Sequence, residues 1–104
     1  MKVDKACPPP HPGAVLREKV LPDIGLTKSA MARRLQISRT LLYGLLGERY
    51  SVTPEMALKL ARLCRNRPEF WLNLQRDYDL WHAARTMKLK AANRAAEMNA
   101  DAAA

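Results

Sequence analysis

The sequence of 104 residues is poor in the features that mark β-sheet, disulfide-rich or membrane-spanning proteins. Valine, isoleucine, glycine and aromatic residues are scarce, whereas alanine, leucine and arginine are abundant, and this composition favours an all-α chain. Its two cysteines are too few for a disulfide scaffold, so we expect reduced thiols and a cytoplasmic protein. No run of about 18 apolar residues is present, so we expect no membrane span. The opening MKVDKACPPP also lacks the apolar stretch of a signal peptide.

Positive charge exceeds negative charge by 8, from 18 basic and 10 acidic side chains. Most of this surplus lies within residues 6–81 rather than in an appended tail. A surplus in the folded part is typical of a protein that binds nucleic acid, although a solvated basic surface would have the same composition. A single domain of this size has little room for a substrate cleft, so we expect no catalytic activity and no cofactor.

Prolines and capping residues divide the chain into an expected strap, five helices and a tail. The proline-rich stretch 7–12 cannot be helical, and the first helix should end before Pro22, because a residue that precedes proline avoids the helical region. Good N-cap residues stand at Thr27, Ser38 and Thr53. The expected segments are an extended strap over 1–12, a domain over 13–81 with helices over 13–21, 27–35, 38–46, from 53 onward and 68–81, and a basic, alanine-rich tail over 82–104 that is helical or frayed.

The second and third expected helices have the spacing of a helix-turn-helix motif. Ala32 is small at the point where the two helices would cross most closely. The residues expected to bury the inner faces are Met31, Leu35, Ile37, Leu42 and Leu45. This arrangement would present the N-terminus of the third helix to the major groove of DNA, and the basic surplus favours that interpretation. An ordinary antiparallel helix hairpin with the same core is the alternative.

One side of the third expected helix turns away from the core in a helical-wheel projection, with Arg39 at its shoulder and Thr40, Tyr43, Gly44 and Gly47 along it. Arg39 could pair with guanine in the major groove, and Thr40 could meet a base edge or a thymine methyl group. Tyr43 would contact a base or a phosphate. Lys28 and Arg49 are placed for phosphates. The residues expected to contact DNA are therefore Lys28, Ser38, Arg39, Thr40, Tyr43 and Arg49.

Aromatic residues gather on one side of the last expected helix. A broad stripe at helical spacing is formed by Phe70, Trp71, Leu74, Tyr78 and Trp81. A five-helix domain of this size needs only part of that stripe for its own core, so we expect the rest to form a dimer interface. The alternative is that all five residues only cover the core.

Several blocks of sequence follow one another at the separations of a known family. They are His11-Pro12-Gly13 with Leu16-Arg17-Glu18, Ala32-Arg33-Arg34-Leu35 with Ser38-Arg39, VTPEMAL over 52–58 and PEFWLNLQ over 68–75. In these blocks the chain resembles the HigA-type antitoxins, also called the VapI family, of the Xre/Cro-repressor class, and the resemblance extends over about residues 11–81. The resemblance implies a five-helix, lambda-repressor-like fold and an antitoxin that neutralises a HigB-type, ribosome-dependent mRNA endoribonuclease. It also implies a homodimer that represses its own operon by binding a palindromic, double-stranded operator.

The chain departs from this family where DNA would be read. Gln36 occupies a turn position usually held by glycine, so either a left-handed backbone would cost about 1 kcal/mol or a different turn would form. Leu41 and Gly44 stand where polar or basic side chains are common, and Glu48 would repel a nearby phosphate. Two alternatives to an antitoxin and autorepressor stay open: a stand-alone transcriptional regulator without a toxin, and a protein-interaction module that no longer binds DNA.

The remaining residues with reactive or ligating side chains predict no further site. Cys7 and His11 have a spacing that would suit a metal, but nothing nearby completes a coordination shell, so we expect no metal. Cys64 follows Leu60 by four residues on the apolar side of its helix and is expected to be a buried thiol. His82 belongs to no catalytic constellation. For the toxin, we expect the strap and the first helix to contribute a surface, because they should lie away from the helix that reads DNA.

Overall fold

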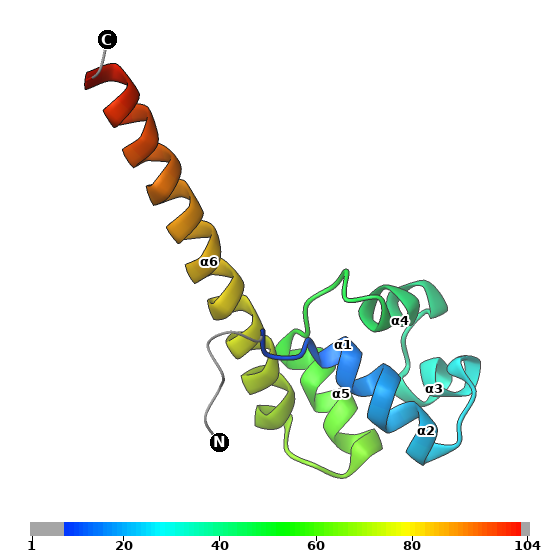
Figure 1. Cartoon of the computed structure of the whole chain (residues 1–104). Helices are drawn as coiled ribbons and strands as arrows, with labels where there is room; N and C mark the ends of the chain where they lie inside the picture. The colour runs from blue at the N-terminus through cyan, green and yellow to red at the C-terminus, as the bar shows by residue number, and fades with distance from the viewer. Residues whose placement is uncertain (1–7, 103–104) are drawn as a thin grey trace.

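Residues 8–102 are described by a computed structural model, and every regular element within that range is a helix (Figure 1). The elements in chain order are α1 (Pro12–Val15), η1 (Leu16–Val20), α2 (Leu21–Ile24), α3 (Lys28–Leu35), α4 (Arg39–Leu46), α5 (Pro54–Cys64) and α6 (Pro68–Ala102). Because α1, η1 and α2 follow one another without a break, these elements form five helical stretches. The prediction of an all-α, five-helix fold with a helix-turn-helix is confirmed.

The first helical stretch continues through Pro22 instead of ending before it, which corrects the expected boundary. A proline inside an α-helix lacks an N–H donor, and its ring collides with the carbonyl group four residues earlier. Ahead of Pro22 the backbone widens into the π-helix η1, where the Leu21 N–H group donates to the Leu16 carbonyl group five residues back. The wider turn makes room for the proline ring. The stretch then ends at Gly25, whose φ of 70° is left-handed.

Three helices begin at the capping residues that the sequence predicts. The hydroxyl oxygens of Thr27, Ser38 and Thr53 each accept a hydrogen bond from the backbone N–H group three residues later, at 3.1, 3.0 and 3.2 Å. Each cap satisfies an N–H group that has no partner inside its helix and contributes about 1 kcal/mol. The starts of α3, α4 and α5 are therefore fixed by local chemistry.

The core lies between α5, the first part of α6 and the helix-turn-helix formed by α3 and α4. α5 packs along α6, α3 contacts α4 and α5, and α1 contacts α4 and α6. The buried hydrophobic residues are Leu16, Met31, Ala32, Leu35, Leu42, Leu45, Leu46, Val52, Met56, Ala57, Leu60, Ala61 and Trp71. The predicted inner faces of the helix-turn-helix are thus buried, with Ile37 only half-buried against the same core.

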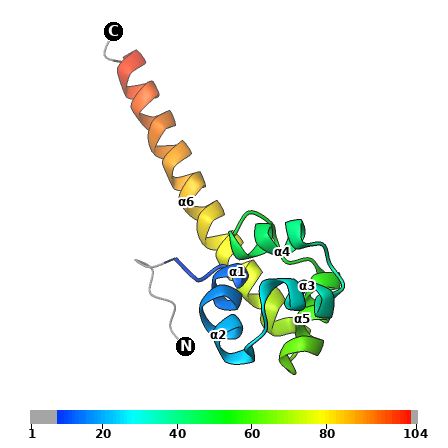
Figure 2. The same ribbon diagram turned by 90° about the vertical axis from the view of Figure 1, so that its right-hand side faces the viewer.

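α6 continues past Trp81 to Ala102, so the described part of the tail belongs to the same helix and is not a frayed segment. Its C-terminal part projects from the bundle in both views (Figures 1 and 2), and the molecule measures 62 × 31 × 22 Å. Side chains over 83–99 are exposed, and the many alanines there give a high intrinsic helix propensity. Among the described helices, none is both long and apolar enough to cross a membrane.

Candidate nucleic-acid interface

The turn between α3 and α4 sets the direction in which α4 leaves the core. Gln36 adopts a left-handed conformation with φ 58° and ψ 45°, which is the first of the two outcomes expected there. Its N–H group donates to the Arg33 carbonyl group at 3.1 Å, and the Ile37 N–H group donates to the Ala32 carbonyl group at 3.0 Å. This pair of bonds is the Schellman motif, which closes the end of a helix and compensates part of the left-handed strain.

Three of the predicted DNA contacts lie on the exposed side of α4. Arg39, Thr40 and Tyr43 are all exposed, with 44% of Tyr43 accessible. The ammonium group of Lys28, at the start of α3, lies 5.6 Å from the centre of the Tyr43 ring, a cation–π contact. The structure therefore brings the beginning of α3 and the outer face of α4 together. Ser38 is exposed too, but its hydroxyl oxygen is engaged as the cap of α4.

The charges on this surface are free to meet an anion. Among residues 8–102, no ion pair involves Lys28, Arg39 or Arg49, and all three are exposed. A hollow between α3 and the start of α4 is lined by Ser29, Ala32, Arg33, Ile37 and Arg39. Arg33 therefore joins the cationic surface, although the wheel projection of the third helix alone gave no reason to select it.

Gly44 does not face outward, and this corrects the helical-wheel expectation. It is buried, and a Cβ atom at this position would overlap the ring of Tyr50. The ring lies over α4 because no side chain is present there, so the mid-helix glycine has a packing role. Gly47 is exposed, as expected. Tyr50 itself gave no signal in the sequence, since the contact depends on the path of the loop after α4.

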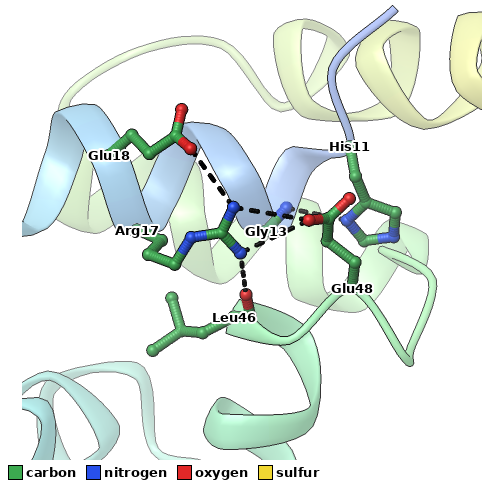
Figure 3. Close-up of polar contacts among 6 residues, drawn as sticks. All are labelled: His11, Gly13, Arg17, Glu18, Leu46 and Glu48. Carbon is green, nitrogen blue, oxygen red and sulfur yellow. Dashed lines mark hydrogen bonds and ion pairs between the residues drawn. The ribbon is translucent and has the colours of Figure 1, made fainter. Parts of the chain in front are cut away.

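Glu48 is not a free acidic group beside α4. Its carboxylate lies 3.3 Å from Nη1 of Arg17 in η1, and Arg17 also pairs with Glu18 at 3.2 Å (Figure 3). Hydrogen bonds to these two carboxylates raise the pKa of the Arg17 guanidinium. The expectation that Glu48 would repel a DNA phosphate is therefore weakened by a partner that is 31 residues away in the chain.

The His11-Pro12-Gly13 block is buried against α4 rather than lying away from it, so the reason for placing a toxin surface there is wrong. Nδ1 of His11 accepts a hydrogen bond from the Gly13 N–H group at 2.9 Å and caps α1. Burial lowers the pKa of His11, against the opposing influence of nearby carboxylates. A Cβ atom on Gly13 would overlap the Leu45 carbonyl oxygen, so α1 touches the end of α4 through backbone. Cys7 lies outside the described residues.

The predicted dimer stripe is divided by the fold. Trp71 is 0% exposed and donates from Nε1 to the Asn66 side-chain oxygen at 3.0 Å, so it belongs to the core and not to an interface. Phe70 is 44% exposed. Leu74, Tyr78 and Trp81 are half-buried along the same helix. The part of the stripe that is not fully buried therefore consists of Phe70, Leu74, Tyr78 and Trp81.

Gln75 holds the frame of the site, although the sequence gave no strong signal for it. Gln75 is 6% exposed, accepts a hydrogen bond from the Val52 N–H group at 2.8 Å and donates to Asp79 at 2.9 Å. It ties α6 to the segment that enters α5. Cys64 is half-buried, and burial raises the pKa of its thiol. The described residues contain no group of three or more side chains that could hold a metal ion.

Comparison with known proteins gives consistent matches. No protein-family model matches the chain. It is 37% identical over 70 residues to virulence-associated protein I of Dichelobacter nodosus, covering 67% of this chain and 65% of that protein. It is 36% identical over 69 residues to antitoxin HigA-1 of Vibrio cholerae, covering 66% of this chain and 65% of the antitoxin. The chain thus spans just under two thirds of the length of these relatives.

A solved antitoxin structure is similar to this chain as well. The antitoxin HigA of Pseudomonas aeruginosa with the higBA promoter superposes with a TM-score of 0.74 at 30% identity, over 80% of this chain and 90% of that one. Other matches are named as helix-turn-helix transcriptional regulators. These relatives are antitoxins and regulators rather than enzymes, which agrees with the prediction that the chain has no catalytic activity.

Proposed function

Since this chain belongs to the HigA antitoxin family of helix-turn-helix proteins, we propose that it binds operator DNA, represses its own operon and neutralises a HigB-type toxin. The observation that carries the DNA-binding part is the exposed face of α4. It combines the free cation Arg39 with two hydrogen-bonding side chains, Thr40 and Tyr43, on a helix whose other side is anchored in the core.

The exposed side chains divide into two kinds of contact. Arg39 and Thr40 occupy the first turn of α4 and are the residues for base edges in the major groove. Lys28 and Arg49 lie at the start of α3 and just after α4, where phosphates flank an inserted helix. Tyr43 bridges the two groups through its contact with Lys28. Because Glu48 is paired with Arg17, the alternative of a module that has lost DNA binding loses one of its supports.

The proposed dimer places two α4 helices about one DNA turn apart, which suits a palindromic operator. Its interface is the exposed part of the aromatic stripe on α6, with Phe70 at the start and Trp81 at the end. Aromatic side chains are enriched in the centres of protein interfaces. The stripe lies on α6, whereas the DNA-contacting residues lie on α3, α4 and the following loop, so both surfaces can be used at once.

The DNA-binding proposal is tested with a duplex from the region upstream of the protein's own gene and a scrambled duplex of equal length. Affinity is measured by fluorescence anisotropy between about 50 and 200 mM salt. We expect tight binding to the upstream duplex and, for about 6–10 phosphate contacts, a loss of about 10³–10⁵ in affinity across that range. Equal affinity for the two duplexes would contradict sequence-specific repression.

Toxin neutralisation is tested separately by co-expression with a HigB-type mRNA endoribonuclease encoded beside the gene. The full chain should restore growth, and absence of rescue would contradict the antitoxin role. A variant without residues 1–9 keeps the His11 side chain that caps α1, so we expect it to fold, which circular dichroism checks. Loss of rescue in that variant would place part of the toxin surface in the proline-rich strap. Retained rescue would place it elsewhere.

A further inference from the structure

The C-terminal end of α4 depends on a side chain from a distant part of the chain. A helix leaves its last four carbonyl groups without intrahelical partners. Three of them accept from the following turn: Gly47 donates to Tyr43 at 2.9 Å, Glu48 to Leu45 at 3.0 Å and Arg49 to Gly44 at 2.8 Å. The fourth, on Leu46, accepts from Nη1 of Arg17 at 2.6 Å. Arg17 therefore completes the closure of the recognition helix.

The first helical stretch is shaped to bring Arg17 to this position. Gly13 and Arg17 are four residues apart and share one face of the stretch. Gly13 allows the backbone of α1 to touch the Leu45 carbonyl group, and one turn later the guanidinium of Arg17 meets Leu46 (Figure 3). Close backbone contact and a side-chain clamp thus act together on the same end of α4.

Glu48 needs the same guanidinium. Its backbone has a φ of 61°, a left-handed conformation that favours glycine or asparagine, so the turn after α4 is strained at this residue. The carboxylate of Glu48 accepts hydrogen bonds from Nη1 and Nη2 of Arg17 at 3.3 and 3.4 Å. The pair both ties the strained turn to η1 and removes a free negative charge next to Arg49.

We propose that Arg17 is a positioning residue for DNA recognition, which holds the end of α4 and neutralises Glu48 without itself contacting DNA. The guanidinium is shared by two carboxylates, Glu18 and Glu48, so the cluster as a whole is not cationic. It therefore offers no net positive charge to a phosphate. Arg17 acts on DNA binding indirectly, because it fixes the direction of α4 and the position of the neighbouring cation Arg49.

This inference rests on the proposed DNA binding and is tested by a double-mutant cycle in the full chain, with Arg17→Met, Glu48→Gln and the double variant. Lys19→Met is the matched control. It removes one positive charge from the same element, but Lys19 lies two residues further on, on the side that faces the end of α5. All variants are titrated with the upstream duplex over the same range of salt.

We expect Arg17→Met to weaken binding about tenfold with Glu48 present and about threefold in the Glu48→Gln background. Lys19→Met should stay within about twofold of the wild type, and the salt slope should be the same for Arg17→Met and Lys19→Met. The inference is overturned if the two methionine variants bind equally well, or if Arg17→Met costs the same in both backgrounds. A slope that falls by about 0.9 per subunit in Arg17→Met alone would make Arg17 a direct phosphate contact and also overturn it.

Amide hydrogen exchange tests the positioning without DNA. Arg17→Met should speed exchange at Gly47, Glu48 and Arg49, whose N–H groups close the end of α4, and leave exchange in α5 unchanged. Unchanged exchange at these three amides would contradict the inference whatever the DNA result. If the wild type fails to discriminate between duplexes while the exchange changes as expected, the proposed function fails and the positioning by Arg17 stands.

Discussion

Replacing Gly13 by alanine should destabilise the fold by about 3 kcal/mol, because the new methyl group has no space beside α4. Its Cβ atom would overlap the Leu45 carbonyl oxygen, lie 2.9 Å from the Leu45 carbonyl carbon and lie 3.1 Å from Nδ1 of His11. The obstructing atoms of Leu45 are backbone and cannot rotate away. α1 must therefore withdraw from α4.

The magnitude has two parts. Overpacking in a close-packed region costs about 1–3 kcal/mol. Withdrawal of α1 also loosens the packing of Leu16, which is 0% exposed. Full burial of a leucine side chain contributes about 1.5–3 kcal/mol, and a gap of a fraction of an ångström loses part of this contribution. Together they give about 3 kcal/mol, a large part of the 5–15 kcal/mol that stabilises an ordinary domain. The melting temperature should fall by roughly 12–24 °C.

Urea unfolding followed by circular dichroism measures the change, and two other glycines are its controls. Gly25→Ala places a methyl group in open space at a φ of 70°, so it should cost about 1 kcal/mol from backbone strain alone. Gly44→Ala meets the Tyr50 ring, a half-exposed side chain that can turn away, so its cost should lie below that of Gly13→Ala. If Gly13→Ala is no more destabilising than Gly25→Ala, the close contact between α1 and α4 is wrong.

Four further substitutions test other parts of the structure. Burial lowers the pKa of His11, so as the pH falls below 6.5 the unfolded chain takes up the proton first and the free energy of unfolding should fall. His11→Asn keeps a capping side chain and should remove this part of the pH dependence between about pH 7 and 5.5, and an unchanged profile would contradict the buried neutral imidazole. Trp71→Ala should lower the free energy of unfolding in urea by about 3–5 kcal/mol, whereas Phe70→Ala should change it by no more than about 1 kcal/mol. Phe70→Ala should instead weaken self-association in sedimentation experiments. A larger loss of stability in Phe70→Ala than in Trp71→Ala would contradict the division of the stripe. Gln36→Gly should raise the free energy of unfolding by about 0.5–1 kcal/mol by relieving the left-handed strain, and a loss of stability would show that the side chain has a role of its own.

The features predicted correctly from the sequence depend on neighbours a few residues apart. Thr27, Ser38 and Thr53 cap their helices because a hydroxyl group at such a position meets an N–H group three residues later in any context. The buried face of the helix-turn-helix follows from helical periodicity in the same way. For Gln36 the local sequence allowed either a left-handed backbone or a different turn. The Schellman hydrogen bonds to the end of α3 favour the left-handed backbone.

The predictions that were wrong, and the contacts that were missed, depend on partners or geometry that local sequence patterns do not reveal. Glu48 is neutralised by Arg17, which precedes it by 31 residues. Trp71 lies on the aromatic stripe but faces the core, because the path of the chain between α5 and α6 turns it inward against Asn66. The continuation of the first helix through Pro22 depends on a widening of the whole preceding turn. In the first two cases the deciding partner is set by the path of the chain, and in the third the geometry of a whole helical turn decides.

The central claim is that α4 reads base sequence through its exposed first turn, and Arg39→Ala tests it most directly. Affinity is measured for the upstream duplex and for a set of duplexes with single base-pair changes in each half-site. The account predicts a loss of about 1–3 kcal/mol per half-site, and a preference that disappears at one base pair while preferences elsewhere remain. An Arg39→Ala variant that keeps both its affinity and its preference at every position would contradict the claim.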